Sequence, residues 1–316
     1  MPKRRSPDGS PSKKKPHVSG FVSILGLPNA GKSTLLNALV GTKLAIVADK
    51  PQTTRTSVQG VLTLPDAQIV FLDTPGIHKS DSLFNRKMMQ TVRAAVEDRD
   101  LLLFLVDVSR PHSNEEEKAL DLVRKGEAPV FLLLNKIDKV KDKRKILPRI
   151  EQLRTLLDFA EYIPISAATG DGLEDLVKAM IAVLPEGPPL FPGDYLTDQP
   201  ERFLAAEIIR EKVLGLTRQE VPHSIAVLVE TWEETGNLLR IAATIYVERE
   251  GQKAIIIGSK GAMLKEVGTL ARQELESFFG RKVFLELFVK VRPEWRNSPE
   301  FLNAIDWRSM AGTESE

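Results

Sequence analysis

An eight-residue stretch near the start of the chain restricts the possible folds more than any other feature: GLPNAGKS, at residues 26–33. It fits the pattern G-x-x-x-x-G-K-[ST], and it lies between an apolar run, FVSIL, and an amphipathic run, STLLNALV. A loop of this kind joins a buried strand to a helix and curls its backbone N–H groups around phosphate oxygens. A purely structural turn would not require the full spacing with both flanks. We therefore predict a phosphate-binding loop in an α/β domain.

Strand-like and helix-like runs alternate through residues 20–184. The near-continuous apolar runs are GFVSIL, QIVFLD, LLLFLVD, PVFLLLN and EYIPIS, and the amphipathic runs are STLLNALVG, SNEEEKALDLVRKG and LEDLVKAMIAVL. Strands that are buried on both faces of a parallel sheet have this composition. Repeated strand–helix units predict a mostly parallel, doubly wound α/β sheet.

Three further motifs each follow a strand-like run: DTPG at 73–76, NKID at 135–138 and ISAATG at 165–170. The carboxyl ends of parallel strands meet at one edge of the sheet, where such sheets bind ligands. A carboxylate such as Asp138 can accept hydrogen bonds from guanine N1–H and from the exocyclic amino group together, and adenine offers no such pair. The four motifs together predict that the nucleotide is GTP or GDP.

The chemistry of the side chains assigns individual roles. We expect Lys32 to reach the β- and γ-phosphates and Gly76 to bring its backbone close to the γ-phosphate. Asn135 either contacts guanine O6/N7 or braces the loop, Lys136 covers a base face, and the N–H of Ala167 donates to O6. The residues predicted to bind nucleotide are Gly26, Leu27, Pro28, Asn29, Ala30, Gly31, Lys32, Ser33, Thr34, Asp73, Thr74, Pro75, Gly76, Ile77, Asn135, Lys136, Ile137, Asp138, Ser166, Ala167 and Ala168.

A polar loop, KPQTTRTS at residues 50–57, lies between the first two motifs. Its paired threonines suit a switch that closes over Mg²⁺ and the γ-phosphate. The motifs predict Ser33 and Asp73 as Mg²⁺ ligands, and the resemblance described below adds Thr54. Thr53 competes with Thr54 for this role, and a surface loop without any ligand is the alternative. In this region the chain resembles translation-factor-type GTPase domains, in which the second threonine of the TTR motif matches Thr54. We predict Lys32, Thr54 and Gly76 as the residues that act in hydrolysis.

One position departs from the pattern of Ras-type GTPases. Ile77 follows DTPG, where a water-orienting glutamine would lie. An isoleucine cannot orient a water molecule by hydrogen bonding. We therefore expect slow intrinsic hydrolysis, or the use of another group that the sequence does not reveal.

A second glycine loop, GSKG at residues 258–261, lacks the spacing of the first. We expect it between a strand-like run and a helix, in the order helix–strand–strand–loop–helix–strand of a small α+β, type II KH-like module. In KH domains a G-x-x-G loop clamps the backbone of about four nucleotides. Residues 251–296 carry nine Lys/Arg against five Asp/Glu, which favours RNA over the alternative, a helix-capping turn. The predicted RNA-binding residues are Ile257, Gly258, Ser259, Lys260, Gly261 and Lys265.

A proline-rich stretch separates these two regions, and 316 residues suit two domains. We predict a basic disordered tail at 1–19, a GTPase domain at 20–184, a linker at 185–200, a KH-like domain at 201–296 and a C-terminal tail at 297–316. Trp295, Phe301 and Trp307 either dock this tail on the module or stack on a base. The chain has no cysteine, which excludes disulfide chemistry, and no apolar run long enough to cross a bilayer.

Taken together, GLPNAGKS, QTTR, DTPG, NKID, SAA and GSKG resemble the bacterial Era family over residues 20 to about 300. The resemblance implies GTP/GDP and Mg²⁺ as cofactors, and binding to single-stranded 16S ribosomal RNA near its 3′ end. It further implies a role in assembly of the 30S subunit, and a location in the cytoplasm and peripherally at the inner face of the cell membrane. We expect a monomer.

Two other functions stay open from the residues alone. One is a GTP-dependent membrane or signalling switch whose C-terminal module binds protein. The other is a constitutive RNA-binding protein whose GTPase domain has lost turnover, although Lys32, Ser33, Thr54 and Asp73 argue against this.

Overall fold

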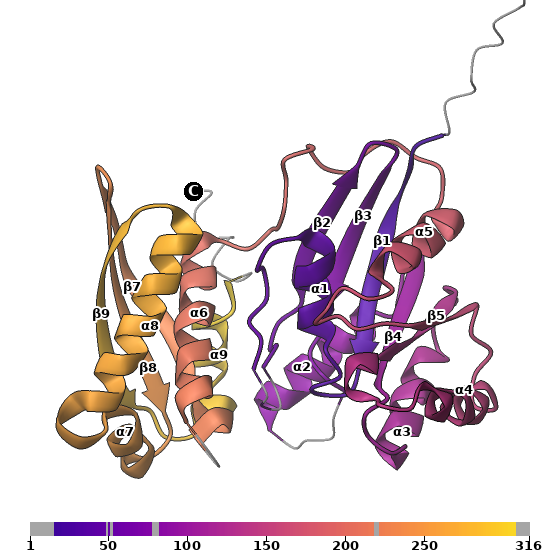
Figure 1. The fold of residues 1–316 in the computed structure, drawn as a ribbon. Helices are drawn as coiled ribbons and strands as arrows, with labels where there is room; N and C mark the ends of the chain where they lie inside the picture. Colours follow the sequence, from indigo (N-terminus) through magenta and orange to yellow (C-terminus); the bar gives the residue numbers. More distant parts are fainter. Residues whose placement is uncertain (1–15, 49, 51–52, 78–81, 218–220, 308–316) are drawn as a thin grey trace, which may run out of the picture.

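The computed structural model describes residues 16–48, 50, 53–77, 82–217 and 221–307 (Figure 1). These residues form two domains, each with its own sheet and hydrophobic core. Residues 1–15 of the predicted disordered tail lie outside this range. The first strand begins at Val18, within the segment predicted as tail.

Six strands form the sheet of the first domain, in the order β2-β3-β1-β4-β5-β6. Their bounds are Val18–Gly26 (β1), Val58–Leu64 (β2), Ala67–Asp73 (β3), Leu101–Asp107 (β4), Val130–Asn135 (β5) and Glu161–Pro164 (β6). Only β2 runs antiparallel to its neighbour. The predicted mostly parallel α/β sheet is confirmed, whereas the edge strand β2 was missed because Gln59 and Gly60 interrupt its apolar pattern.

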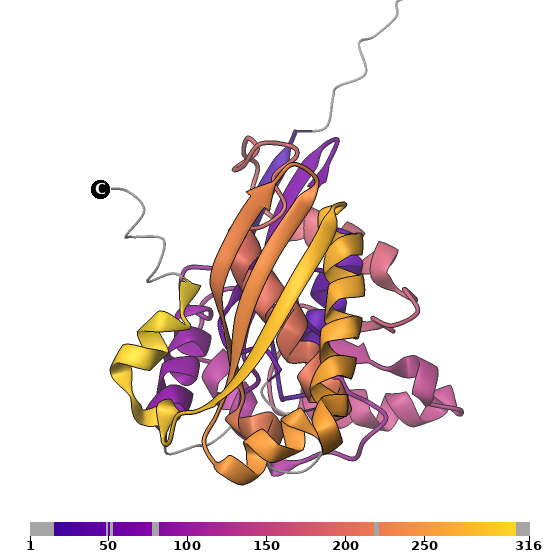
Figure 2. The same cartoon turned by 90° about the vertical axis from the view of Figure 1, so that its left-hand side faces the viewer.

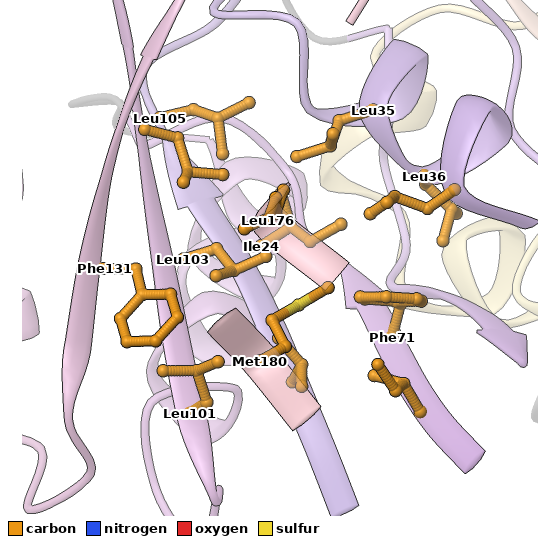
Figure 3. Packing of buried hydrophobic residues seen from close by; sticks show 14 of the residues in the cluster. Ile24, Leu35, Leu36, Phe71, Leu101, Leu103, Leu105, Phe131, Leu176 and Met180 are labelled. Atoms are coloured by element: carbon orange, nitrogen blue, oxygen red, sulfur yellow. The ribbon is translucent and has the colours of Figure 1, made fainter. Parts of the chain in front are cut away.

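Helices cover both faces of this sheet. Their bounds are Lys32–Val40 (α1), Leu83–Ala94 (α2), Asn114–Val123 (α3), Ile146–Arg154 (α4) and Leu173–Val183 (α5). Strand β4 shows why its sequence is apolar throughout. Leu101, Leu103 and Leu105 pack with α1 and α5, as Figure 3 shows, and the alternate residues pack with α2, α3 and α4 on the other face. Burying each such side chain contributes about 1.5–3 kcal/mol.

The second domain has the order α6-β7-β8-α7-α8-β9. Its bounds are Glu201–Leu216 (α6), Ala226–Thr235 (β7), Leu238–Val247 (β8), Glu250–Ile257 (α7), Ala262–Phe279 (α8) and Lys282–Val291 (β9). Strand β8 pairs antiparallel with β7 and parallel with β9. Helices α6 and α8 pack on one face of this sheet, between it and the first domain (Figures 1 and 2). Val267, Ala271 and Leu275 of α8, which recur at helical spacing, are buried.

The strand expected before the GSKG loop is wrong, because the isoleucines of AIII belong to the short helix α7. Branched isoleucines favour strands when they are judged alone. Here the N-terminus of α7 is capped, since Gln252 Oε1 accepts from the backbone N–H groups of Glu248 and Arg249 at 2.9 and 3.1 Å. Ile256 is fully buried while Ile255 is half-exposed, so the helix presents only one face to the core.

The predicted linker contains no helix or strand, apart from one bridge between Val18 and Glu186, and it is held along the first domain. The buried side chain of Gln68 accepts from the N–H groups of Leu190 and Phe191 at 2.7 and 2.8 Å. Farther along, the N–H of Val61 donates to Leu196 O at 2.9 Å. The approach to the second domain is therefore anchored along β2 and β3.

Residues 297–307 of the predicted C-terminal tail pack on the rest of the protein, and residues 308–316 lie outside the described range. Trp295 is fully buried and donates from Nε1 to Ser224 O at 3.0 Å. With Phe301 of α9 (Pro299–Ala304) it packs in a cluster that includes Phe84 and Met88 of α2. Trp307 is also buried. Of the two roles considered for these aromatics, the structure shows docking, and the surface on which they dock includes the first domain.

Candidate functional site

The first glycine loop connects β1 to α1. Gly31 caps α1 with φ 103°, and no side chain caps this helix terminus. A Cβ at Gly31 would lie 2.3 Å from Asn135 Nδ2, so this position accepts only glycine. The unbonded N–H groups and the positive end of the helix dipole form a site for an anion.

Lys32 lies inside this loop, with 6% of its side chain exposed. Its Nζ donates to the carbonyl oxygens of Gly26 and Leu27 at 3.2 and 3.0 Å. Burial lowers the pKa of Lys32 to about 8, against the opposing charge of Asp73. Placing a cation here without a strong anionic partner is unfavourable, and phosphate oxygens would supply that partner.

The three predicted magnesium ligands meet beside Lys32. Ser33 Oγ donates to Asp73 Oδ2 at 2.6 Å and lies 2.7 Å from Thr54 Oγ1, which itself donates to Asp73 Oδ2 at 3.2 Å. Asp73 is fully buried, and burial raises its pKa despite Lys32 and these hydrogen bonds. Its Oδ1 atom has no hydrogen-bond partner among the described residues. Two hydroxyls and an unsatisfied carboxylate oxygen are hard donors that fit Mg²⁺.

The structure distinguishes the two threonines. The hydroxyl of Thr53 donates into its own loop, to Lys50 O at 2.7 Å, whereas the hydroxyl of Thr54 faces Ser33 and Asp73. No group of three or more His, Cys, Asp or Glu side chains that could hold a metal occurs in the described part of the chain. A site with one carboxylate suits Mg²⁺, which keeps waters and phosphate oxygens as its other ligands.

The NKID and SAA loops form the other part of the site. Asn135, with 1% of its surface exposed, donates from Nδ2 to Ala30 O at 2.8 Å and accepts at Oδ1 from the N–H of Ala167 at 3.0 Å. Of the two roles considered for Asn135, the structure shows bracing, and it engages the N–H that was predicted to reach guanine O6. The exposed Asp138 accepts from Ser166 Oγ at 2.7 Å.

Lys136 links this loop to the first glycine loop. Its Nζ donates to Asn29 O and to Asp107 Oδ2, both at 2.7 Å. Sequence reasoning missed Asp107, although it ends a buried strand at the same edge of the sheet as Asp73. That position is the signal that could have identified it.

These groups surround a cavity of about 380 Å³. The predicted residues that line it are Pro28, Asn29, Gly31, Lys32, Ser33, Thr34, Thr54, Gly76, Asn135, Lys136, Asp138, Ala167 and Ala168. The lining also includes residues that were not predicted: Ile46, Val47, Ala48, Thr53 and Lys139. The predicted residues outside the lining are Gly26, Leu27, Ala30, Asp73, Thr74, Pro75, Ile77, Ile137 and Ser166.

Ile77 and Thr74 have structural contacts instead. Ile77 is buried in the core formed with α2, α3 and α4. Thr74 is fully buried and donates from Oγ1 to Ile24 O at 2.8 Å. The side chain of Ile77 therefore points into the protein and away from the phosphate end of the cavity.

The GSKG loop lies between α7 and α8 and is open to solvent. Ser259 and Lys260 are exposed, and so is Lys265 in the second turn of α8, while Ile257 is half-buried. Gly258 has φ 70°, and a Cβ there would lie 2.7 Å from Met263 Cβ. Gly261 caps α8 in the left-handed conformation, again with no side-chain cap. The N–H groups of Gly261 and Ala262 donate within the loop, to Gly258 O and Ser259 O, so the positive end of the helix dipole is what this terminus offers to an anion.

Known proteins share both parts of this arrangement. A family model described as 50S ribosome-binding GTPase matches residues 21–136, and one described as KH domain matches residues 220–296. The chain is 50% identical over 294 residues to GTPase Era of Geobacter metallireducens, covering 92% of this chain and 98% of that protein. It is 46% identical over 292 residues to GTPase Era of Staphylococcus haemolyticus, covering 92% and 97%.

Two solved structures are similar along the same length. One is Era in complex with MgGDPNP and nucleotides 1506–1542 of 16S ribosomal RNA, and the other is an Aquifex aeolicus Era variant bound to GDP and AlF4⁻. Each is 44% identical, has a TM-score of 0.89, and is matched over 92% of this chain and 99% of its own. With a G domain, a KH domain and this identity over nearly its whole length, the chain belongs to the Era family of GTPases.

Proposed function

We propose that the first domain binds GTP with Mg²⁺ and hydrolyses it to GDP and phosphate. The observation that carries this proposal is the meeting of Ser33, Thr54 and Asp73 beside the buried Lys32, in a cavity that Asp138 also lines. When bound, Mg²⁺ neutralises phosphate charge. A similar Era protein was solved with MgGDPNP, which supports the choice of ligands.

The protein groups then have separate tasks. Lys32 and the backbone N–H groups of the first loop hold the phosphates, and Ser33 and Thr54 present their hydroxyls to the metal. Asp138 accepts from the two guanine donors, so it selects guanine over adenine. Because Ile77 is buried in the core and has no group that could orient a water molecule, we expect slow intrinsic turnover.

We further propose that the GSKG loop binds single-stranded ribosomal RNA of the small subunit near its 3′ end. The exposed Ser259 and Lys260 and the N-terminus of α8, which no side chain caps, support it, as does the similarity to Era solved with nucleotides 1506–1542 of 16S ribosomal RNA. Such a clamp joined to a GTPase fits a monomeric factor in 30S assembly. We place it in the cytoplasm and peripherally at the cell membrane. Among the described helices, none combines the length and apolar character that crossing a bilayer requires.

Two measurements test this function. Phosphate release from GTP should require Mg²⁺, and ATP in excess should not compete. A gel shift with a single-stranded RNA that carries the 3′ end of 16S ribosomal RNA should show salt-sensitive binding. Mg²⁺-dependent turnover without any RNA binding would favour a switch whose second domain binds protein. RNA binding without turnover would favour a protein whose GTPase is inactive.

A further inference from the structure

The loop between α1 and β2 is described at residues 41–48, 50 and 53–57, and several of these residues, although part of the first domain in sequence, are held by the second domain. Its Ile46 is buried in the hydrophobic core of the second domain, and the same residue lines the nucleotide cavity. The N–H of Val47 donates to Glu211 Oε1 of α6 at 2.8 Å. Lys43 Nζ donates to Glu211 Oε2 at 2.6 Å and also contacts Glu274 of α8. The second domain therefore supports Lys43, Ile46 and Val47, whereas Asn37 of α1 holds the N–H groups of Leu44 and Ala45.

The contacts on either side of Thr54 follow the same pattern. Arg210 of α6 donates from Nη2 to the backbone oxygen of Thr53. Arg55 donates to Ile225 O, and its guanidinium lies 5.2 Å from the ring centre of Phe84 and 5.7 Å from that of Trp295. Thr54, whose hydroxyl faces Ser33 and Asp73, thus has a contact to the second domain at each of its neighbours, Thr53 and Arg55.

The side chain of Arg210 is held in one orientation by its surroundings. Its side chain is only 1% exposed, and Glu207 holds the guanidinium with two hydrogen bonds, from Nε to Oε1 at 2.7 Å and from Nη2 to Oε2 at 2.6 Å. A guanidinium oriented in this way has little freedom left, so the carbonyl that it holds is fixed too. An arginine buried to this degree is costly for stability alone, because similar packing could be obtained with an apolar side chain.

We propose that Arg210 is a positioning residue for GTP hydrolysis, acting from the RNA-binding domain through Thr53 to keep the Thr54 hydroxyl beside Ser33 and Asp73. The proposal rests on the proposed function, because it needs Thr54 at the metal. The new element is that a residue of the second domain affects how much Mg²⁺ the first domain needs for GTP hydrolysis. Arg210 does not contact the nucleotide cavity, so it acts only through the loop.

The test compares two variants. Glu207→Gln/Arg210→Met removes the guanidinium without leaving a carboxylate beside an apolar side chain, and Glu207→Gln alone keeps the contact to Thr53. In the double variant, the Mg²⁺ concentration for half-maximal GTP hydrolysis should rise about tenfold and kcat should fall about tenfold, since small misplacement of a catalytic group has effects of this size or larger. Glu207→Gln alone keeps the guanidinium and one acceptor for it, so its effect on both measures should be clearly smaller than that of the double variant.

Two further measurements separate positioning from a loss of structure. GDP affinity at saturating Mg²⁺ should stay within about twofold of the wild type, because Thr54 responds to the γ-phosphate. In a Thr54→Ala background the double variant should have no additional effect, since both changes remove the same interaction. If the double variant does not fold, Arg210→Lys is measured in its place. This variant keeps the positive charge but cannot form the paired hydrogen bonds of the guanidinium.

The outcomes are distinct. A folded variant that lacks the guanidinium and hydrolyses GTP with an unchanged Mg²⁺ requirement overturns the positioning role, as does an effect that adds in full to that of Thr54→Ala. Wild-type protein that hydrolyses GTP equally well without Mg²⁺ would instead overturn the proposed function.

Discussion

The two glycine loops of this protein are alike in backbone and opposite in surroundings. Each precedes a helix capped by a left-handed glycine without a side-chain cap, and each contains a non-glycine residue at positive φ, Asn29 in the first and Lys260 in the second. Lys32 of the first loop is 6% exposed and lies in a cavity, whereas Lys260 of the second is open to solvent.

If the proposed function holds, this difference explains how two similar loops bind two kinds of ligand. A helix N-terminus attracts any phosphate. An enclosed loop with a buried lysine and a buried carboxylate can hold the end of a small molecule from several sides. An exposed loop can only contact one side of a chain that passes by, as an RNA strand does. The groups around the loop, and not the glycines themselves, select the ligand.

Removing the buried lysine should have the largest effect and should separate the two loops. Lys32→Ala should weaken GTP binding by about 3–5 kcal/mol, because phosphate charge would face a buried site without its cation. RNA affinity measured without nucleotide should not change. Fluorescent-GTP titration and RNA filter binding on the same preparation check this. If the variant bound nucleotide with nearly wild-type affinity, the buried position of Lys32 would not be important for phosphate binding.

Asp138, which we expect to contact the guanine base, distinguishes the two loops further, because the GSKG loop has no equivalent residue. Asp138→Asn should weaken GTP binding by about 2–4 kcal/mol, since an amide cannot accept from both guanine donors. The same variant should bind XTP better than the wild type does, because the C2 oxygen of xanthine can accept from the new amide. Competition titrations measure both changes. Equal competition by ATP and GTP in the wild type would contradict the role of Asp138.

A rise in pH above 8 should weaken GTP binding at the buried loop. The pKa of Lys32 is about 8 in the absence of nucleotide, and bound phosphates should raise it. Binding then takes up a proton above this pH, so GTP affinity should fall as pH rises beyond 8, by up to about tenfold per pH unit. Calorimetry at pH 9 in two buffers of different ionisation enthalpy should report the proton. An affinity that is flat from pH 7.5 to 9.5 would show that Lys32 stays charged in the empty site.

Local motifs were predictable from sequence because their chemistry depends on neighbours along the chain. The spacing of GLPNAGKS, DTPG and NKID places glycines, a lysine and carboxylates at the ends of strands, and the structure brings Ser33, Asp73 and Asp138 to one edge of the sheet. The residues alone left Thr53 and Thr54 open, because side-chain direction in an irregular loop depends on tertiary contacts. The resemblance to translation-factor-type GTPases selected Thr54, and the structure agrees.

The features that the sequence analysis predicted wrongly or did not predict also depend on tertiary contacts. Helix α7 forms although its isoleucines favour a strand, because its capped N-terminus and the buried Ile256 outweigh propensity. Arg210, Glu211 and the C-terminal α9 segment act across the domain interface. They lie 157, 164 and 216 residues along the chain from their partners Thr53, Val47 and Lys87. No local pattern reports such contacts.

The central claim is that the two loops hold phosphates of two separate ligands. The most direct test is Ser259→Asp/Lys260→Asp, assayed for both ligands. Its control, Thr155→Asp/Lys178→Asp, makes the same change of charge at exposed positions of the first domain. RNA affinity of the loop variant should fall about tenfold or more, with the salt dependence flatter by about one unit of slope. GTP affinity without RNA should not change, and the control should keep both affinities. A folded loop variant that binds RNA like the wild type, or that loses GTP affinity, would contradict the claim.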